Sequence, residues 1–370
     1  MRILLANYTE ITFPGGIHKT VREMAKNLAK NHEVNVIQGN TFGLPETEFY
    51  DGYQINRIKS RLGDQLFGFS PKMYFSIKKY LKTFNPDIIH VHGYHKLFSP
   101  EIIYLTKKIE PQIPIVFSPH LDIYRSSLAG KYLWNIYNLF GKVAFDKSSH
   151  ITSCSNFEAQ TIINEYNVNE DKISIINHGI NIFKPDKNKN QNEIIHLIYS
   201  GHLIDRKGIS FLLKSLHSLI YELNTDNVIL TIIGEGSEKK KLIRLSKDLR
   251  LENHIIWKPF LERDELINEI SNADIFMLLS KSEAFGIVIA ESLALGTPCI
   301  VTKKAALTEL TAENGCFGVD YPPDPVKVAN LILEIYKNNI SAGPLSNKIR
   351  SWEKVVKDYE KLYFESLKAD

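Results

Sequence analysis

Short apolar runs alternate with amphipathic helical stretches along most of the chain, and this alternation predicts an α/β protein. The opening residues show the pattern: an apolar run at Arg2–Ala6, apolar positions on one helix face from Ile17 to Leu28, and a second run at Val34–Ile37. Later runs with the same character are Asp87–Val91, Ile115–Ser118, His150–Ser153, His196–Ser200, Val228–Ile233 and Ile255–Phe260. We expect them to be buried strands of parallel sheets, which are covered by helices on both faces.

The clearest strand–loop–helix–strand pattern lies between residues 273 and 302. The apolar run Ile275–Leu279 predicts one buried strand, and Cys299–Val301 predicts its neighbour. Between them, a helix is expected to begin at about Phe285 and to end at Gly296. The loop before this helix therefore lies at the carboxyl end of a parallel strand, which is where open α/β sheets bind ligands.

Two carboxylates and a run of backbone amides give this loop candidate chemistry. Glu291 is the only charged residue between positions 284 and 302, so it is expected to meet a polar partner at the opening of the sheet. Glu283 precedes the helix. Four amides at the helix start are expected to bind an anion such as phosphate, those of Phe285, Gly286, Ile287 and Val288. Alternatively, Glu283 only caps the helix and Glu291 pairs with a neighbouring Lys or Arg.

The motif Glu283-x7-Glu291, with Phe285-Gly286 between the glutamates, resembles the signature of the GT-B glycosyltransferases, in particular the retaining group known as family 4. The resemblance covers nearly the whole chain. It implies an α/β fold of two Rossmann-like domains, each a doubly wound parallel sheet, that face a central cleft. It also implies transfer of a sugar from a nucleotide diphosphate donor to an acceptor hydroxyl, with the anomeric configuration retained.

Length and composition agree with two domains. The chain has 370 residues, 44% of them hydrophobic and 24% charged, which is ordinary for a globular protein with two cores. The polar stretch Pro185–Glu193 has the composition of a linker. We therefore expect an N-terminal, acceptor-side domain at 1–185 and a nucleotide-sugar-binding domain at 186–351. By resemblance, a helix at 352–370, with an apolar stripe that starts at Trp352, packs back on the first domain.

Charge and cysteine usage narrow the class of protein. The net charge of +3 is too small for a nucleic-acid binder. No apolar run is long enough to span a membrane, and three widely spaced cysteines fit a reducing cytoplasm. The helix expected at Ser70–Phe84 is basic and amphipathic. Such a surface can lie against anionic lipid at the inner face of a membrane, but the same pattern is typical of a solvated helix.

A second loop of the predicted nucleotide-sugar domain carries basic residues. The strand His196–Ser200 is followed by His202 and then by Arg206-Lys207-Gly208. Relatives in the resembled family have an arginine and a lysine at this spacing, which hold the donor diphosphate. Lys207 matches the lysine, but His202 stands in the arginine position, so phosphate binding should weaken unless His202 is protonated or Arg206 reaches the phosphate. The other interpretation is a solvated turn.

Histidines and a glycine turn mark the predicted ligand-binding edge of the first domain. His120 follows the strand Ile115–Ser118, and by resemblance it contacts the donor sugar, with Asp122 placed to orient it. The turn Pro14-Gly15-Gly16 resembles the family's glycine-rich loop, so Gly16 is expected at the donor site.

A run of three histidines, at positions 90, 92 and 95, allows a different interpretation. Two histidines at i and i+2 on a strand share one face and could ligate zinc. No carboxylate or thiolate lies nearby in sequence to complete such a site. The resemblance offers a metal-free account, because relatives often end this strand with a similar run.

The resemblance implies a role for each candidate. Glu283 holds the transferred sugar and stabilises positive charge on it, Glu291 holds the ribose hydroxyls, and Lys207 holds the diphosphate. We expect no cofactor and no metal, a UDP- or GDP-linked donor, and a saccharide or lipid-linked acceptor in surface-polysaccharide or lipid-linked glycan synthesis. Three alternatives remain: a relative such as a sugar-nucleotide epimerase or phosphorylase, a non-catalytic nucleotide-sugar binder, and a metal-dependent hydrolase that uses the three histidines.

Overall fold

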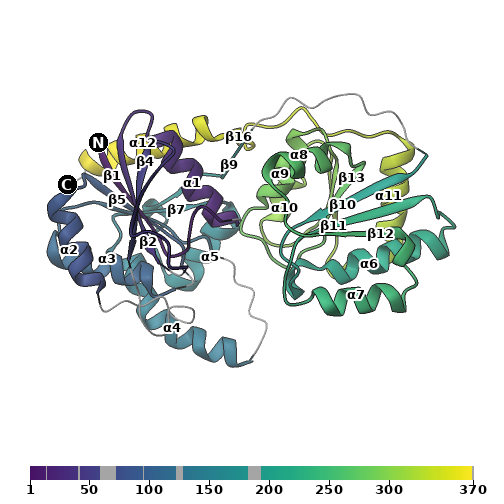
Figure 1. Ribbon diagram of the computed structural model, residues 1–370, viewed down its shortest axis with the longest axis horizontal. Coiled ribbons are helices and arrows are strands. Elements are labelled where there is room, and N and C mark those ends of the chain that lie inside the picture. The colour runs from purple at the N-terminus through teal and green to yellow at the C-terminus, as the bar shows by residue number, and fades with distance from the viewer. Residues whose placement is uncertain are drawn as a thin grey trace. The chain divides into compact units, whose positions relative to one another are not determined.

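Two compact units divide the chain in the computed structural model (Figure 1). The first comprises Met1–Gly179 and Arg350–Asp370, and the second comprises Ile180–Ile349. The structure describes residues 1–13, 15–40, 42–58, 72–94, 96–121, 128–181 and 193–368. The predicted domain boundary between residues 185 and 186 lies outside these ranges. A two-stranded sheet pairs β9 (Gly179–Ile180) with β16 (Arg350–Ser351), where the chain leaves and re-enters the first unit.

An eight-stranded sheet forms the centre of the first unit within the described ranges, in the order β3-β4-β2-β1-β5-β6-β7-β8. The β3–β4 pair is antiparallel and the other pairs are parallel. The strands are β1 (Arg2–Asn7), β2 (Glu33–Gly39), β3 (Thr47–Tyr50), β4 (Tyr53–Ile58), β5 (Ile88–His92), β6 (Ile115–Ser118), β7 (His150–Ser153) and β8 (Ile173–Ile175). The predicted strand at 115–118 is confirmed, and so is the one at 150–153.

Helices cover both faces of this sheet because its strands are apolar on both sides. Along β1, Ile3 and Leu5 face one core and Leu4 and Ala6 face the other, as the strand period of two requires. The helices are α1 (Gly16–Leu28), α2 (Met73–Thr83), α3 (Phe98–Ile109), α4 (Leu128–Lys147), α5 (Asn156–Tyr166) and α12 (Trp352–Lys368). The predicted start of α2 at Ser70 and Pro71 lies outside the described residues.

The C-terminal helix α12 is part of the first unit's core. Its buried residues pack with α1 and with β1, β2 and β4. They are the apolar stripe of the sequence, Trp352, Val355, Val356, Tyr359, Leu362 and Tyr363. Gly179 permits the helix start to approach, because a Cβ at this position would lie 2.7 Å from the Cα of Trp352.

The second unit contains, in its described part, a six-stranded parallel sheet in the order β12-β11-β10-β13-β14-β15. The strands are β10 (Ile195–Ser200), β11 (Val228–Ile233), β12 (Ile255–Lys258), β13 (Ile275–Leu278), β14 (Cys299–Thr302) and β15 (Cys316–Val319). The strand order reverses between β10 and β13, which makes the carboxyl ends of these two strands the topological switch point of the sheet. The predicted α/β class with parallel, Rossmann-like sheets is therefore confirmed.

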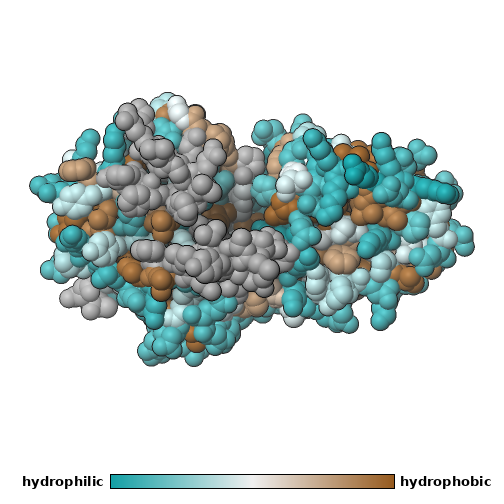
Figure 2. Space-filling view, turned by 90° about the horizontal axis from the view of Figure 1, so that it is seen from below, coloured by the Kyte–Doolittle hydropathy of each residue, from teal (hydrophilic) through white to brown (hydrophobic). Residues whose placement is uncertain are grey.

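The strand order determines which side of the sheet each helix of the second unit covers. In Figure 1, α6 and α7 lie on one side of the sheet and α8 and α9 on the other, as right-handed crossovers require when the order reverses. The helices are α6 (Ile209–His217), α7 (Lys239–Asp248), α8 (Arg263–Asn272), α9 (Ile287–Ala294), α10 (Leu307–Leu310) and α11 (Pro325–Lys337). The face drawn in Figure 2 is mainly hydrophilic over this unit, with scattered apolar patches, as expected when most large apolar side chains are in a core.

No helix within the described ranges combines the length and apolar character needed to cross a membrane.

Candidate functional site

Two loops meet at the switch point of the second unit. One follows β10 and contains the short turn Asp205–Lys207, and the other follows β13 and leads into α9. Lys281 N donates to Arg206 O at 2.7 Å, and Ser280 Oγ donates to the same oxygen at 3.0 Å. Arg206 Nη1 in turn donates to Ser282 O at 3.2 Å. These hydrogen bonds join loops that are far apart in sequence into one rigid structure.

Lys207 and Glu283, two predicted site residues, form an ion pair where the loops meet. The distance between Lys207 Nζ and Glu283 Oε1 is 2.6 Å, and the side chains are only 15% and 11% exposed. An ammonium group has three donors, so a lysine bound to one carboxylate oxygen can still donate to a second anion. A partly buried pair of this kind holds the ammonium group of Lys207 in a fixed position at the carboxyl edge of the sheet.

Gly208 explains how the first loop comes so close to β13. Its φ of 69° is in the left-handed region, and a Cβ on it would lie 1.9 Å from the carbonyl oxygen of Leu279. Only glycine fits this close approach. The turn can therefore place Lys207 directly beside the loop that carries Glu283.

Helix α9 begins at Ile287, slightly after the predicted start at about Phe285. Gly286 is the N-cap residue, with a φ of 96° that no helical residue adopts. The first hydrogen bonds within the helix are donated to Gly286 O by the amides of Ile289 and Ala290. The amides of Ile287 and Val288 therefore begin the helix, as predicted, whereas those of Phe285 and Gly286 belong to the loop.

Glu291 pairs with an arginine, as the alternative interpretation expected, although the sequence analysis did not identify this arginine as Arg263. Both Nη atoms of Arg263 contact its carboxylate, Nη1 to Oε2 at 3.0 Å and Nη2 to Oε1 at 2.6 Å. The Glu291 side chain is 5% exposed, so this bidentate pair supplies the polar partner that a buried carboxylate requires. Arg263 opens α8, the helix that follows β12.

Histidines lie at the carboxyl edge of the sheet in the first unit. His120 is buried and has a left-handed φ of 51°. Its Nε2 lies 3.1 Å from His92 Nδ1, and its ring also stacks on that of His178, with centroids 5.2 Å apart. The predicted residue His120 is therefore held between two other histidines, one on β5 and one after β8.

His90 does not have the geometry of a metal ligand. Its Nδ1 lies 2.6 Å from Tyr363 OH on α12, and its Nε2 lies 2.7 Å from Ser118 Oγ. Both ring nitrogens are therefore engaged, and His95 lies outside the described residues. A zinc site built on the histidines at positions 90, 92 and 95 would therefore lack His90 as a ligand.

Comparisons with known proteins show which family the chain belongs to. Residues 14–183 match the family model described as Glycosyltransferase Family 4, and residues 180–352 match the model described as Glycosyl transferases group 1. The chain is also similar over its full length to sucrose-phosphate synthase from Thermosynechococcus elongatus, with a TM-score of 0.81, 19% identity and 100% of both chains covered. The chain belongs to the family 4 glycosyltransferases of the GT-B fold.

Two other similar proteins cover nearly the whole of this glycosyltransferase. The N-acetyl-alpha-D-glucosaminyl L-malate synthase of Bacillus anthracis is 23% identical over 390 aligned positions, which cover 96% of this chain and 95% of the relative. The solved complex of Anabaena Alr3699/HepE with UDP-glucose has a TM-score of 0.71, 18% identity and 100% coverage of both chains.

His202 is the main departure of this glycosyltransferase from the resembled motif. Its ring packs edge-to-face on Phe260, with centroids 5.2 Å apart. Partial desolvation, followed by the positive charges of Lys207 and Arg206, lowers the pKa of His202 below its ordinary value of 6.5. His202 is therefore neutral at pH 7, and it does not supply the positive charge of an arginine.

Gly16 begins α1, as expected from the glycine turn, whereas Pro14 and Asp122 lie outside the described residues. Among the residues that the structure describes, no atom lies within 4 Å of the position that a Cβ on Gly16 would take. Thr20 Oγ1 donates to Gly16 O at 3.0 Å and lies 3.5 Å from His178 Nδ1. The start of α1 is thereby linked to the histidines of the first unit.

Glu158 is a further residue of this region that sequence reasoning missed. Its buried carboxylate accepts hydrogen bonds from the amide of Leu121 at 2.6 Å and from that of Cys154 at 2.7 Å. Burial raises the pKa of Glu158. The carboxylate thus fixes the peptide that follows His120. The signal in the sequence was the capping pattern Ser155-x-x-Glu158, in which Ser155 Oγ accepts from Glu158 N at 3.1 Å.

Proposed function

We propose that this glycosyltransferase moves a sugar from a UDP- or GDP-linked donor to an acceptor hydroxyl, with retention and without a metal cofactor. The observation that carries the proposal is the Lys207–Glu283 ion pair beside the start of α9, at the switch point of the sheet. Open α/β sheets bind nucleotides at such a point. The UDP-glucose held by the similar Alr3699/HepE supports a nucleotide sugar as donor.

The diphosphate is proposed to lie against Lys207 and the amides of Ile287 and Val288. When the bond between the sugar and the phosphate oxygen breaks, its electron pair remains on the diphosphate, and negative charge grows there. An ammonium group and a helix N-terminus that are already in place stabilise this charge without reorganisation. Arg206 is proposed to assist, and His202 can add one hydrogen bond from its ring N–H while it is neutral.

The transferred sugar becomes positively charged in an oxocarbenium-like transition state. Glu283 is proposed to hold the sugar and stabilise this charge, and His120 to contact the sugar. The acceptor oxygen forms the new bond to the anomeric carbon, and its hydroxyl proton leaves with the nucleoside diphosphate. Glu291 is proposed to accept hydrogen bonds from the ribose hydroxyls while Arg263 holds its carboxylate in place.

The acceptor is proposed to be a saccharide or lipid-linked glycan, and the enzyme to act in the cytoplasm, peripherally at the inner face of an anionic membrane. Helix α2 supports the membrane contact, because it exposes Tyr74 and Phe75 together with Lys78, Lys79 and Lys82. Exposed aromatics beside lysines are typical of surfaces that bind anionic lipid.

A sugar-nucleotide epimerase or a non-catalytic binder would use the same loops, but the relative's name, a synthase of a glucosaminyl compound, favours transfer. The experiment that tests the proposal incubates the protein with UDP- and GDP-sugars, with and without saccharide acceptors. A glycosylated acceptor with the anomeric configuration of the donor, formed after chelation of metals, is the expected product. An epimerised sugar nucleotide formed without acceptor, an inverted linkage, or donor binding without turnover would each overturn it.

A further inference from the structure

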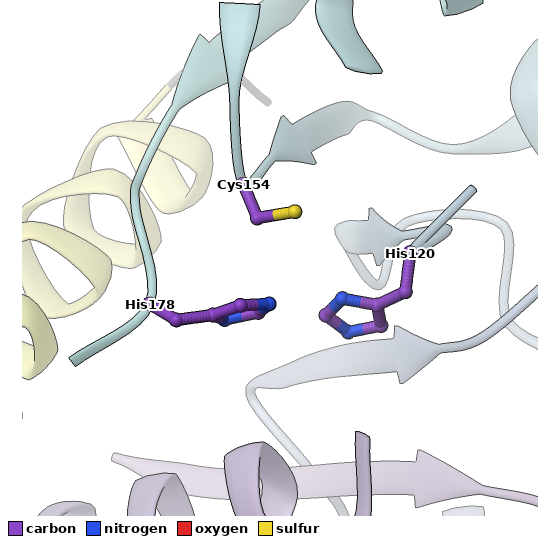
Figure 3. A group of neighbouring side chains, drawn as sticks. All are labelled: His120, Cys154 and His178. Atoms are coloured by element: carbon purple, nitrogen blue, oxygen red, sulfur yellow. The ribbon is translucent and has the colours of Figure 1, made fainter. Parts of the chain in front are cut away.

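Three buried side chains of the first unit converge on one point: His120, Cys154 and His178. One donor atom from each, an imidazole nitrogen or the sulfur, lies within 4.8 Å of the other two. In Figure 3 the rings of His120 and His178 point toward one another across a gap, and the sulfur of Cys154 lies over that gap. The three residues follow three neighbouring strands, β6, β7 and β8, at the carboxyl edge of the sheet.

Hydrogen bonds around the cluster select the nitrogen of each histidine that faces the gap. His120 Nε2 contacts His92 Nδ1, and His178 Nδ1 contacts Thr20 Oγ1. Coordination of an ion would use the other nitrogen of each ring, His120 Nδ1 and His178 Nε2. Histidines that bind metals usually donate their second N–H to a neighbouring polar group, which fixes the tautomer and the ring orientation.

A buried carboxylate lies beside the cysteine of the cluster. The carboxylate of Glu158 accepts a hydrogen bond from the Cys154 side chain and another from its amide. When the sulfur binds a cation, the thiol proton leaves, and a thiolate remains as the ligand.

We propose that His120, Cys154 and His178 bind one divalent cation of the zinc class. Two imidazoles and one thiolate are the ligands such a cation prefers, at about 2.0–2.1 Å for nitrogen and about 2.3 Å for sulfur. The donor atoms lie within 4.8 Å of one another, so the three side chains would have to move closer together to reach these distances. Three protein ligands leave a fourth position open for water or a substrate hydroxyl. This site differs from the metal-free expectation and from the run at 90, 92 and 95.

The site has a consequence for the proposed reaction. An ion bound to His120 removes this side chain from the donor sugar, so occupancy by zinc is expected to inhibit transfer. The nucleotide part of the donor is proposed to bind residues of the second unit, and none of the three metal ligands belongs to that unit. A nucleotide-induced thermal shift therefore tests the proposed function separately from the metal site.

The test titrates the full-length protein, freed of metal with a chelator, with Co²⁺ as a probe. The expected result is one ion per chain and a thiolate-to-cobalt charge-transfer absorption, both displaced by Zn²⁺. Cys154→Ser should abolish the absorption and weaken binding by about 100-fold or more. Cys316→Ser, which changes another buried cysteine in the second unit, should leave the titration unchanged.

The proposal is overturned if the wild-type protein binds no stoichiometric Co²⁺, or if it binds Co²⁺ without the charge-transfer absorption. It is also overturned if Cys154→Ser gives the wild-type spectrum. Should that variant fail to fold, His178→Gln provides the second test, with weaker binding and an altered cobalt spectrum expected. The wild-type spectrum alone already reports whether sulfur is a ligand.

Discussion

The carboxylate of Glu291 accepts hydrogen bonds from both Nη atoms of Arg263, at 3.0 and 2.6 Å. Arg263 is proposed to hold the Glu291 carboxylate in position to accept hydrogen bonds from the ribose hydroxyls. Glu291→Ala should therefore abolish the thermal shift that the preferred nucleotide produces. A ligand at 100 times its Kd stabilises the wild-type protein by about 2.7 kcal/mol, which such a shift detects easily.

The structural cost of losing Glu291 is measured separately, as the change in Tm without nucleotide. Glu269→Ala is the matched control, because Glu269 lies on α8 and pairs with Lys258 at 2.7 Å. The control should keep the full nucleotide shift. A full shift in Glu291→Ala would remove the ribose assignment.

Replacement of Lys207 tests the proposed diphosphate-binding site. Lys207→Met removes the ammonium group proposed to stabilise the leaving diphosphate, and kcat should fall about 100- to 1000-fold. Lys281→Met is the control, since Lys281 pairs with Asp205 at 2.7 Å on the same two loops and has no proposed role in transfer. Equal rates for the two variants would contradict the proposed role of Lys207.

His92 is proposed to act as a positioning residue through its hydrogen bond to His120. His92→Leu removes a bond worth about 1 kcal/mol, so kcat should fall about fivefold while the donor KM changes little. His92→Gln keeps a polar group in reach of His120 Nε2 and should restore much of the rate. An equal loss in both variants, or a loss confined to the donor KM, would contradict a positioning role.

The stability of the protein should fall as the pH is lowered from 6.5 toward 4.5. Burial lowers the pKa of His90 to about 3 and that of His178 to about 4, whereas both titrate near 6.5 in an unfolded chain. In this pH range the unfolded state therefore binds more protons, and each histidine reduces the free energy of unfolding by about 1.4 kcal/mol per pH unit.

Urea denaturation at pH 7 and pH 5 measures this loss. His178→Asn removes one of the titrating groups and should show a smaller difference between the two pH values. Identical stabilities of the wild-type protein at both pH values would show that these histidines do not gain protons on unfolding.

Helix α2 predicts binding to anionic vesicles. Phe75 is 72% exposed and lies among exposed lysines, so Phe75→Ser should reduce co-sedimentation with vesicles that contain phosphatidylserine. Phe364→Ser is the control, because Phe364 on α12 is 49% exposed. Binding that is unchanged in Phe75→Ser, or that is lost equally in both variants, would argue against a lipid-binding face on α2.

The sequence predicted the features that depend on local patterns. Buried strands such as Ile115–Ser118 are short apolar runs, and the buried stripe of α12 repeats with the helical period. The start of α9 was misplaced because an apolar periodicity does not reveal that Gly286 adopts a positive φ. A backbone conformation of this kind depends on the packing around it, here on Leu307.

Partners that are distant in sequence could not be predicted in the same way. Arg263 reaches Glu291 from the helix after a different strand, and nothing local to either residue indicates the pairing. The histidine run at 90, 92 and 95 suggested a metal site because its members are neighbours in sequence. The residues that converge in space are instead His120, Cys154 and His178, which only the strand order β6-β7-β8 brings together.

The position of α12 in the first unit determines the order in which the protein can be completed during synthesis. The ribosome makes the whole second unit before it makes Trp352 and Tyr363, yet these side chains fill the core beneath β1. Until α12 has been synthesised, the first unit therefore exposes the apolar face of its sheet that α12 covers in the folded protein. A nascent chain stalled before Arg350 should consequently bind chaperones through its N-terminal half.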